Sequence, residues 1–193
     1  MSGWRLEIER LERIVDKEYL TTKQATAIGS LWEHLRPKRI VEIGTFKGTG
    51  ACYLGALAKF YDGHVTTIDL PWTGRINDKI TVLAETQLAA CGVDNVTVVR
   101  REDGAEGWFR EFFLRGEPPL DFVYLDGGHQ WLNTAAQFAM AWSALRSGGW
   151  ICMDDLEHIV YPDVDLVWRE IAVRLAPNKD RYTANRQGFA MRR

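Results

Sequence analysis

The stretch Arg39-Ile-Val-Glu-Ile-Gly-Thr-Phe-Lys-Gly-Thr-Gly50 decides the fold of this 193-residue chain. Its apolar, β-branched first part leads directly into three glycines: Gly44, Gly48 and Gly50. An amphipathic pattern over 51–60 follows at once. The stretch therefore predicts a strand, a tight turn and a helix, which together open an α/β nucleotide-binding unit.

The glycine spacing distinguishes between the nucleotides that such a loop can bind. A dinucleotide fingerprint reads G-x-G-x-x-G and places a pyrophosphate at the helix N-terminus. This loop reads G-x-x-x-G-x-G, and Glu42 stands just before it. A carboxylate there repels a phosphate and suits a ligand that carries an amine. We interpret the stretch as an S-adenosylmethionine loop.

Composition fits one domain of ordinary globular type. Hydrophobic residues make up 46% of the chain, enough for one large core, and the net charge of −2 gives no nucleic-acid footprint. No apolar run approaches the roughly 20 residues of a membrane span, and the N-terminal segment lacks a signal-peptide core. Three scattered cysteines in apolar stretches, Cys52, Cys91 and Cys152, favour reduced thiols in a cytoplasm. We expect a cytoplasmic protein without nucleic-acid or membrane partners.

Helical and strand patterns alternate along the whole chain, without a repeat or a linker. Five strands, each followed by a helix, predict a parallel sheet with helices on both faces, because parallel strands need crossovers. The last two strand patterns are close enough to pair as a hairpin, and Thr22 is a candidate cap for the second helix. Helices are predicted over 5–17, 22–35, 51–60, 78–90, 105–114, 131–145 and 166–175. Strands are predicted over 40–43, 64–68, 96–99, 122–125, 150–153, 181–184 and 188–191.

With these elements in place, residues 39–193 resemble the class I S-adenosylmethionine-dependent methyltransferases. The resemblance implies a Rossmann-like, doubly wound, mostly parallel sheet of order 3-2-1-4-5-7-6 with a C-terminal antiparallel hairpin strand. It also implies a ligand site at the carboxyl ends of the strands, where open α/β sheets generally bind ligands. Residues 1–193 then form a single methyltransferase domain. In it, 39–193 are the cofactor-binding catalytic core, and the helices of 1–38 form a lid or a homo-oligomer contact.

Acids after the second and third strands extend the predicted cofactor site. Asp69 lies about 20 residues beyond the loop, where a carboxylate can accept both ribose hydroxyls; an Asp at a strand boundary is also common without a ligand. In the family the acid after the third strand lies against the adenine, which assigns Asp103; it could instead cap the next helix. The expected cofactor-binding residues are Glu42, Gly44, Thr45, Phe46, Gly48, Asp69, Asp103 and Asp126.

Three further acids follow neighbouring strands of the predicted sheet. Asp126 ends the fourth strand, and Asp154 and Asp155 end the fifth. Carboxylates that converge raise one another's pKa, and a hard divalent cation such as Mg²⁺, Mn²⁺ or Ca²⁺ removes that cost. The arrangement resembles the metal-dependent small-molecule O-methyltransferases, many of which have Asp-Asn where this chain has Asp-Asp. The alternative is that one of the pair caps the following segment and that no metal binds.

His129 follows Asp126 by three residues, an offset that in these O-methyltransferases often carries the general base. An unperturbed imidazole titrates near pH ~6.5 and can accept the proton of a substrate hydroxyl. A lone histidine is otherwise most often structural. Trp72, Trp131, His158 and Tyr161 are candidates for the edge of the acceptor pocket.

The hypothesis from the sequence is an S-adenosylmethionine-dependent O-methyltransferase for a small hydroxylated molecule, assisted by a divalent cation, most simply Mg²⁺. An acceptor with adjacent oxygens, such as a catechol, a sugar diol or a hydroxy acid, would suit a metal-bridged site. Three alternatives stay open. They are a metal-independent N- or O-methyltransferase, a non-catalytic S-adenosylmethionine-binding protein of the same fold, and, as the weakest, a nicotinamide oxidoreductase.

Overall fold

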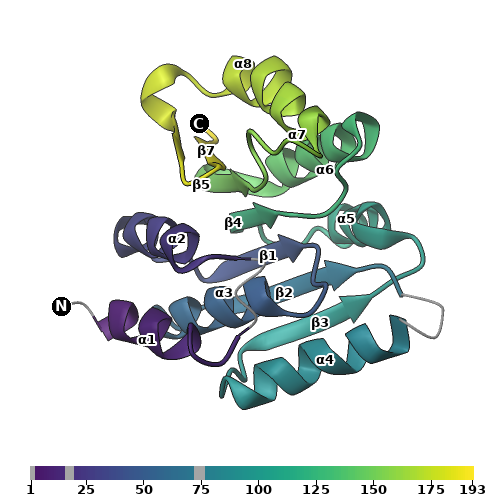
Figure 1. Ribbon diagram of the computed structural model, residues 1–193. Coiled ribbons are helices and arrows are strands. Elements are labelled where there is room, and N and C mark those ends of the chain that lie inside the picture. Colours follow the sequence, from purple (N-terminus) through teal and green to yellow (C-terminus); the bar gives the residue numbers. More distant parts are fainter. Residues whose placement is uncertain (1–2, 16–19, 72–76) are drawn as a thin grey trace.

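The computed structural model describes residues 3–15, 20–71 and 77–193, with side chains from residue 84 onward after the second gap. In this part of the chain, a seven-stranded sheet forms the centre of the molecule (Figure 1). Its order is β3-β2-β1-β4-β5-β7-β6, which confirms the predicted order. The strands are β1 Arg39–Ile43, β2 His64–Asp69, β3 Val96–Arg100, β4 Leu120–Leu125, β5 Leu145–Met153, β6 Arg181–Ala184 and β7 Gln187–Met191.

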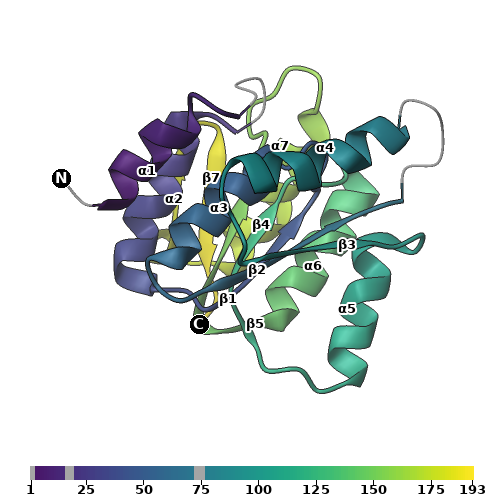
Figure 2. The same ribbon diagram turned by 90° about the horizontal axis from the view of Figure 1, so that it is seen from below.

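Helices cover both faces of the sheet, as Figure 2 shows from below. One apolar cluster joins one sheet face to the first four helices, and a second cluster joins the other face to the later helices. Among the described residues, no helix is long and apolar enough to cross a membrane. The helices are α1 Gly3–Leu11, α2 Thr22–Leu35, α3 Thr49–Lys59, α4 Asn77–Ala90, α5 Gly104–Leu114, α6 Trp131–Ala144, α7 Pro162–Val167 and α8 Val173–Leu175.

Strand register brings the predicted site residues to one edge. β1 pairs in parallel with β2 and β4, and β4 pairs in parallel with β5. Ile43 is level with Leu125, and Leu125 is level with Met153. The residues directly after these positions, Gly44 and Asp126 among them, therefore emerge side by side at the carboxyl edge.

The C-terminal strand pair closes the sheet in the predicted way. β7 pairs antiparallel with β5 and with β6. The helix before it differs from the expectation, because it starts at Pro162 and contains a π-helical turn, Trp168–Ala172. Proline is favoured in the first turn of a helix, where its missing N–H costs nothing.

The N-terminal helices belong to the core. Trp4 and Leu11 of α1 are buried in the same cluster as Trp32 of α2. α1 ends at Leu11, whereas a helix to residue 17 was predicted, and residues 16–19 lie outside the described part. α2 is capped by Thr21, one residue before the predicted cap.

Candidate active site

A cavity of about 870 Å³ opens at the carboxyl edge of the sheet. Its wall contains the glycine loop after β1, Asp69 after β2, and the acids after β4 and β5. Leu20, just before α2, also lines it. The size falls within the range of small-molecule sites, about 300–1,000 Å³. The topology has therefore gathered the predicted cofactor and acid residues, except Gly48, around one cavity.

Glycine is required at two positions of the loop. Gly44 has φ 98°, and a Cβ there would lie 2.0 Å from the carbonyl oxygen of Asp126. Gly48 has φ 86°, and a Cβ there would lie 3.0 Å from the Cα of Ala84. Both backbone conformations are strained for residues with a side chain. The spacing recognised in the sequence thus reflects close packing of the loop against the turn after β4 and against α4.

Glu42 lies beneath the loop rather than at its surface. It is 1% exposed, and one carboxylate oxygen accepts a hydrogen bond from the Thr67 hydroxyl at 2.5 Å. The Thr67 and Thr45 hydroxyls are themselves 2.6 Å apart. Burial, with the charges of Asp126 and Asp69, raises the pKa of Glu42 well above its usual value. Glu42 thus supports the loop from below, and its contact with a ligand amine stays a prediction.

Asp69 ties the end of β2 to the glycine loop. Its carboxylate accepts the backbone N–H of Phe46 at 2.7 Å and that of Leu70 at 2.8 Å. Phe46 itself has a positive φ of 43°. Asp69 therefore holds the loop in its strained conformation, and it lines the cavity beside it. Its predicted ribose contact is untested.

Asp103 forms ion pairs instead of capping α5. Arg101 contacts it at 2.8 Å and Arg110 at 3.1 Å, and the hydrogen bond from Arg101 holds the pKa of Asp103 below its usual value. No side-chain capping bond forms at this helix start. The carboxylate lies so close to α5 that a Cβ on Gly107 would approach it within 1.9 Å. Asp103 lines the cavity, where an adenine amine would share its oxygens with the two arginines.

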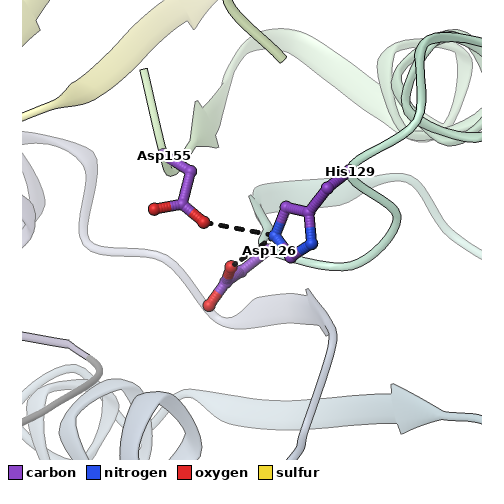
Figure 3. Close-up of side chains that lie close together, drawn as sticks. All are labelled: Asp126, His129 and Asp155. Atoms are coloured by element: carbon purple, nitrogen blue, oxygen red, sulfur yellow. Dashed lines mark ion pairs between the residues drawn. The ribbon is translucent and has the colours of Figure 1, made fainter. Parts of the chain in front are cut away.

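Asp126, His129 and Asp155 form a compact cluster between the ends of β4 and β5 (Figure 3). The His129 Nε2 lies 3.2 Å from an Asp155 oxygen and 3.8 Å from an Asp126 oxygen. The imidazole also stacks on the Tyr161 ring, with centroids 4.0 Å apart and planes 11° from parallel. Tyr161 is in turn stacked with His158. The ring of His129 is thus fixed with Nε2 toward two carboxylates.

The charges of Asp126, His129 and Asp155 affect one another's pKa values. Contacts with Asp126 and Asp155 raise the pKa of His129 to about 9. Burial raises the pKa of Asp126, although His129 opposes this. Burial raises the pKa of Asp155, but the ion pair with His129 and the nearby positive charges leave it below the usual value. In this state the imidazole is a protonated ion-pair partner at neutral pH.

Asp154 faces another way. It is 6% exposed, and its oxygens accept hydrogen bonds from the side chains of Gln24 and Tyr124 and from the Asp155 N–H. Burial, together with the charge of Asp126, raises its pKa to about 7. Of the three predicted metal ligands, the structure brings together Asp126 and Asp155 but not Asp154. The third member of the cluster is His129.

The cluster can hold a divalent cation. Each of its three residues offers one ligand atom, and these atoms lie within 4.8 Å of one another. His129 Nε2 is buried and has no hydrogen-bond partner of good geometry among the described residues. Two carboxylate oxygens suit Mg²⁺ or Mn²⁺, and an imidazole nitrogen extends the choice to Zn²⁺ or Fe²⁺. The donor set therefore fits a metal, though of mixed rather than all-oxygen type.

A smaller cavity of about 540 Å³ adjoins the cluster. His129, Asn133, Val160 and Tyr161 are among its lining residues. Trp131 lies at the start of α6 and is exposed, and its backbone N–H donates to the Asp163 carboxylate at 2.9 Å. The predicted edge residues Tyr161 and His158 do line the larger cavity, and Trp72 lies outside the described residues.

The buried polar residues near the site that were not predicted include Gln24, Tyr124 and Thr67. Tyr124 and Thr67 stand in apolar strand patterns that gave no sign of their partners. Gln24 did have a signal, because a Thr followed three residues later by Gln is a capping box. That signal locates a helix start but names no partner elsewhere.

Comparison with known proteins gives a family match. A family model described as a methyltransferase domain matches residues 41–156, more than half of the chain. The chain therefore belongs to the methyltransferase domain family. This confirms the resemblance to class I S-adenosylmethionine-dependent methyltransferases. None of the curated proteins compared with the chain matches it in sequence.

Solved structures support the fold at low sequence identity. The O-methyltransferase TomG from Streptomyces achromogenes, in complex with SAM, has a TM-score of 0.65 at 20% identity, covering 100% of this chain and 91% of TomG. An O-methyltransferase from Bacillus cereus in complex with SAH has a TM-score of 0.67 at 17% identity, with coverages of 100% and 92%. The SAH-bound methyltransferase PaMTH1 from Podospora anserina has a TM-score of 0.66 at 16% identity, with coverages of 100% and 89%.

Proposed function

We propose that the chain is an S-adenosylmethionine-dependent O-methyltransferase that acts on a hydroxyl of a small molecule with the help of a divalent cation. One observation carries the proposal. The glycine loop and the Asp126–His129–Asp155 cluster line the same cavity, so that a methyl donor and a hydroxyl acceptor can meet there. The solved O-methyltransferases of the same fold bind SAM or SAH.

The cofactor lies along the loop. Gly44 and Gly48 let the loop pack closely against the turn after β4 and against α4. Asp69 holds Phe46 in place and would face the ribose. Glu42, beneath the loop, is the acid that would face the ligand amine, and a bound cationic amine would lower its raised pKa. Asp103 and Asp126 also line this cavity.

The acceptor enters from the side of His129 and Tyr161, where the smaller cavity adjoins the site. His129 would take the proton of the acceptor hydroxyl. The oxygen would then bond to the methyl carbon as the sulfur–methyl bond breaks, and neutral S-adenosylhomocysteine would leave. Without a cation the imidazole is protonated at neutral pH, because two carboxylates raise its pKa to about 9. Asp126 and Asp155 would hold a divalent cation, which when bound would offset their negative charge and lower the pKa of a nearby hydroxyl. With its carboxylates engaged, His129 returns toward the ordinary pKa of ~6.5 and can act as a base.

Asp126 and Asp155 are the residues that would hold the cation, and Asp154 supports Asp155 by accepting its backbone N–H. His129 is either the third ligand or the base, since one nitrogen cannot serve as both. The stacking on Tyr161 orients the ring for either role. We assign it the role of base. The buried free thiols of Cys52, Cys91 and Cys152 fit a cytoplasmic enzyme.

Calorimetry and crystals test the proposal. S-adenosylhomocysteine should bind, and NAD should bind more weakly or not at all. Anomalous scattering from Mn²⁺-soaked crystals should give a peak beside Asp126 and Asp155. Methyl transfer to a panel of catechols, sugar diols and hydroxy acids should be lost with EDTA and restored by Mg²⁺ or Mn²⁺. Tighter binding of NAD would exclude the methyltransferase function, and activity that survives EDTA would favour a metal-independent enzyme.

A further inference from the structure

Gln24 connects the N-terminal helices to the acid pair after β5. Its side-chain Nε2 donates to Asp154 Oδ1 at 2.7 Å, across 130 residues of sequence. Its Oε1 accepts the backbone N–H of Thr21 at 2.9 Å, as part of the capping box of α2. Both Gln24 and Asp154 are more than nine-tenths buried. One amide thus caps a helix with its oxygen and holds a carboxylate with its nitrogen.

Asp154, held by Gln24, in turn restrains the backbone of Asp155. The same oxygen that accepts from Gln24 also accepts the backbone N–H of Asp155 at 2.9 Å. Asp155 has φ 59°, a left-handed conformation that a residue with a side chain adopts only when its surroundings hold it. The Asp155 carboxylate then points at His129 Nε2, 3.2 Å away. The conformation of Asp155 depends on the placement of Asp154, and Asp154 is fixed by Gln24 on one side and Tyr124 on the other.

We propose that Gln24 is a positioning residue: through Asp154, it sets the backbone of Asp155 and so the orientation of the Asp155 carboxylate in the cluster. The first turn of α2, which contains Gln24, then helps to set the geometry of the site. The inference rests on the proposed function for its catalytic meaning, but the chain of contacts from Gln24 to His129 does not depend on a cation or an acceptor.

The test uses the imidazole ¹⁵N spectrum of the metal-free protein, labelled at its four histidines. The His129 signals are assigned with His129→Gln. Gln24→Met removes both polar groups of the amide at similar volume, and Gln24→Glu keeps the capping acceptor but removes the donor to Asp154. Thr21→Ala is the matched control, because it weakens the same capping box and leaves the bond to Asp154 intact. If Gln24→Met does not fold, Gln24→Glu, with a common capping-box residue, carries the test.

We expect the His129 signals to shift in Gln24→Met and in Gln24→Glu, but not in Thr21→Ala. The His34 and His64 signals should keep their positions in all three variants. Unshifted His129 signals in the folded Gln24 variants, or an equal shift in Thr21→Ala, would overturn the proposal.

Mn²⁺ alone is the second probe, and free Mn²⁺ is measured by electron paramagnetic resonance. Its affinity should fall about tenfold in Gln24→Met, the effect of one lost hydrogen bond to a charged group, and change less than about twofold in Thr21→Ala. Equal affinities of wild type and Gln24→Met would contradict the proposal. A wild type that binds no Mn²⁺ would instead remove the cation from the proposed function, and the histidine spectra would decide the role of Gln24.

Discussion

Replacing Asp69 with alanine tests how the glycine loop is held. The variant removes a carboxylate that accepts two backbone N–H groups, from Phe46 at 2.7 Å and from Leu70 at 2.8 Å. The bond from Leu70 is exposed, so water can replace the lost oxygen. The bond from Phe46 is part-buried, and Phe46 has a positive φ that the bond helps to maintain. The main structural loss is therefore the restraint on Phe46.

The expected loss of affinity in Asp69→Ala follows from the number of hydrogen bonds that the variant loses. A hydrogen bond to a charged group contributes about 1.5–3 kcal/mol. Losing one such bond in the bound state, either within the loop or to a ribose hydroxyl, should weaken the binding of S-adenosylhomocysteine about 10- to 150-fold. Loss of both contacts would exceed this range. The fold should persist, because Asp69 lies at the end of β2 and its apolar neighbours stay in place.

Isothermal titration calorimetry with S-adenosylhomocysteine measures the affinity directly. Asp94→Ala is the control. Asp94 is an exposed acid before β3, and its ion pair with Lys59 at the surface contributes little to the free energy of folding. It should bind the ligand as the wild type does. An affinity of Asp69→Ala within about twofold of wild type would refute the reasoning, since a charged hydrogen bond cannot contribute so little. So would an equal loss in Asp94→Ala.

Three further predictions concern the same edge of the sheet. Gly44→Ala should lower the free energy of unfolding by more than ~2 kcal/mol in urea titrations, because a Cβ would lie 2.0 Å from the Asp126 carbonyl oxygen at a φ of 98°. A smaller loss would mean that the loop relaxes easily. In the metal-free protein, the pKa of His129 is raised to about 9, above the ~6.5 of an unfolded chain. The ion pairs of His129 therefore stabilise the folded state fully below pH ~6.5. This stabilisation is lost as the pH rises through about 9. The difference in unfolding free energy between wild type and His129→Gln should shrink over that interval, and a constant difference would contradict the raised pKa. With a verified acceptor, His129→Ala should lower kcat by ~10²–10⁴-fold and leave the affinity for S-adenosylhomocysteine unchanged; a wild-type kcat would show that another group takes the proton.

Most of the sheet could be predicted because its strands have simple patterns. β1 and β4 are buried on both faces, and each reads as a short apolar run that ends in an acid or a glycine. Helical patterns between them leave a parallel arrangement as the physical solution. The glycine spacing near Gly44 and Gly48 was equally readable, since it reflects local backbone conformation. The positions of Asp69 and Asp126 then followed from the strand ends.

The orientation of side chains could not be predicted in the same way. Asp154 and Asp155 are neighbours in sequence, yet one faces Gln24 and Tyr124 and the other faces His129. This divergence depends on a positive φ at Asp155 and on a partner 130 residues away, and neither leaves a trace in the local pattern. The π-helical turn after α7 is likewise a result of packing, because its residues fit an ordinary helical period.

The position of β7 has a consequence for the order in which the molecule assembles on the ribosome. β5 carries the acid pair at its end, and it lies between β4 and β7, with Ile151 level with Ala190 and Met153 level with Gly188. Until Gln187–Met191 have been synthesised, β5 remains an open edge, and open edges invite pairing with other chains. The half of the sheet that carries the glycine loop already has its partners by then. In a nascent chain the strands beside the glycine loop are therefore paired before β5 has a neighbour on both sides, and stalling in that interval exposes the strand that leads to Asp154 and Asp155.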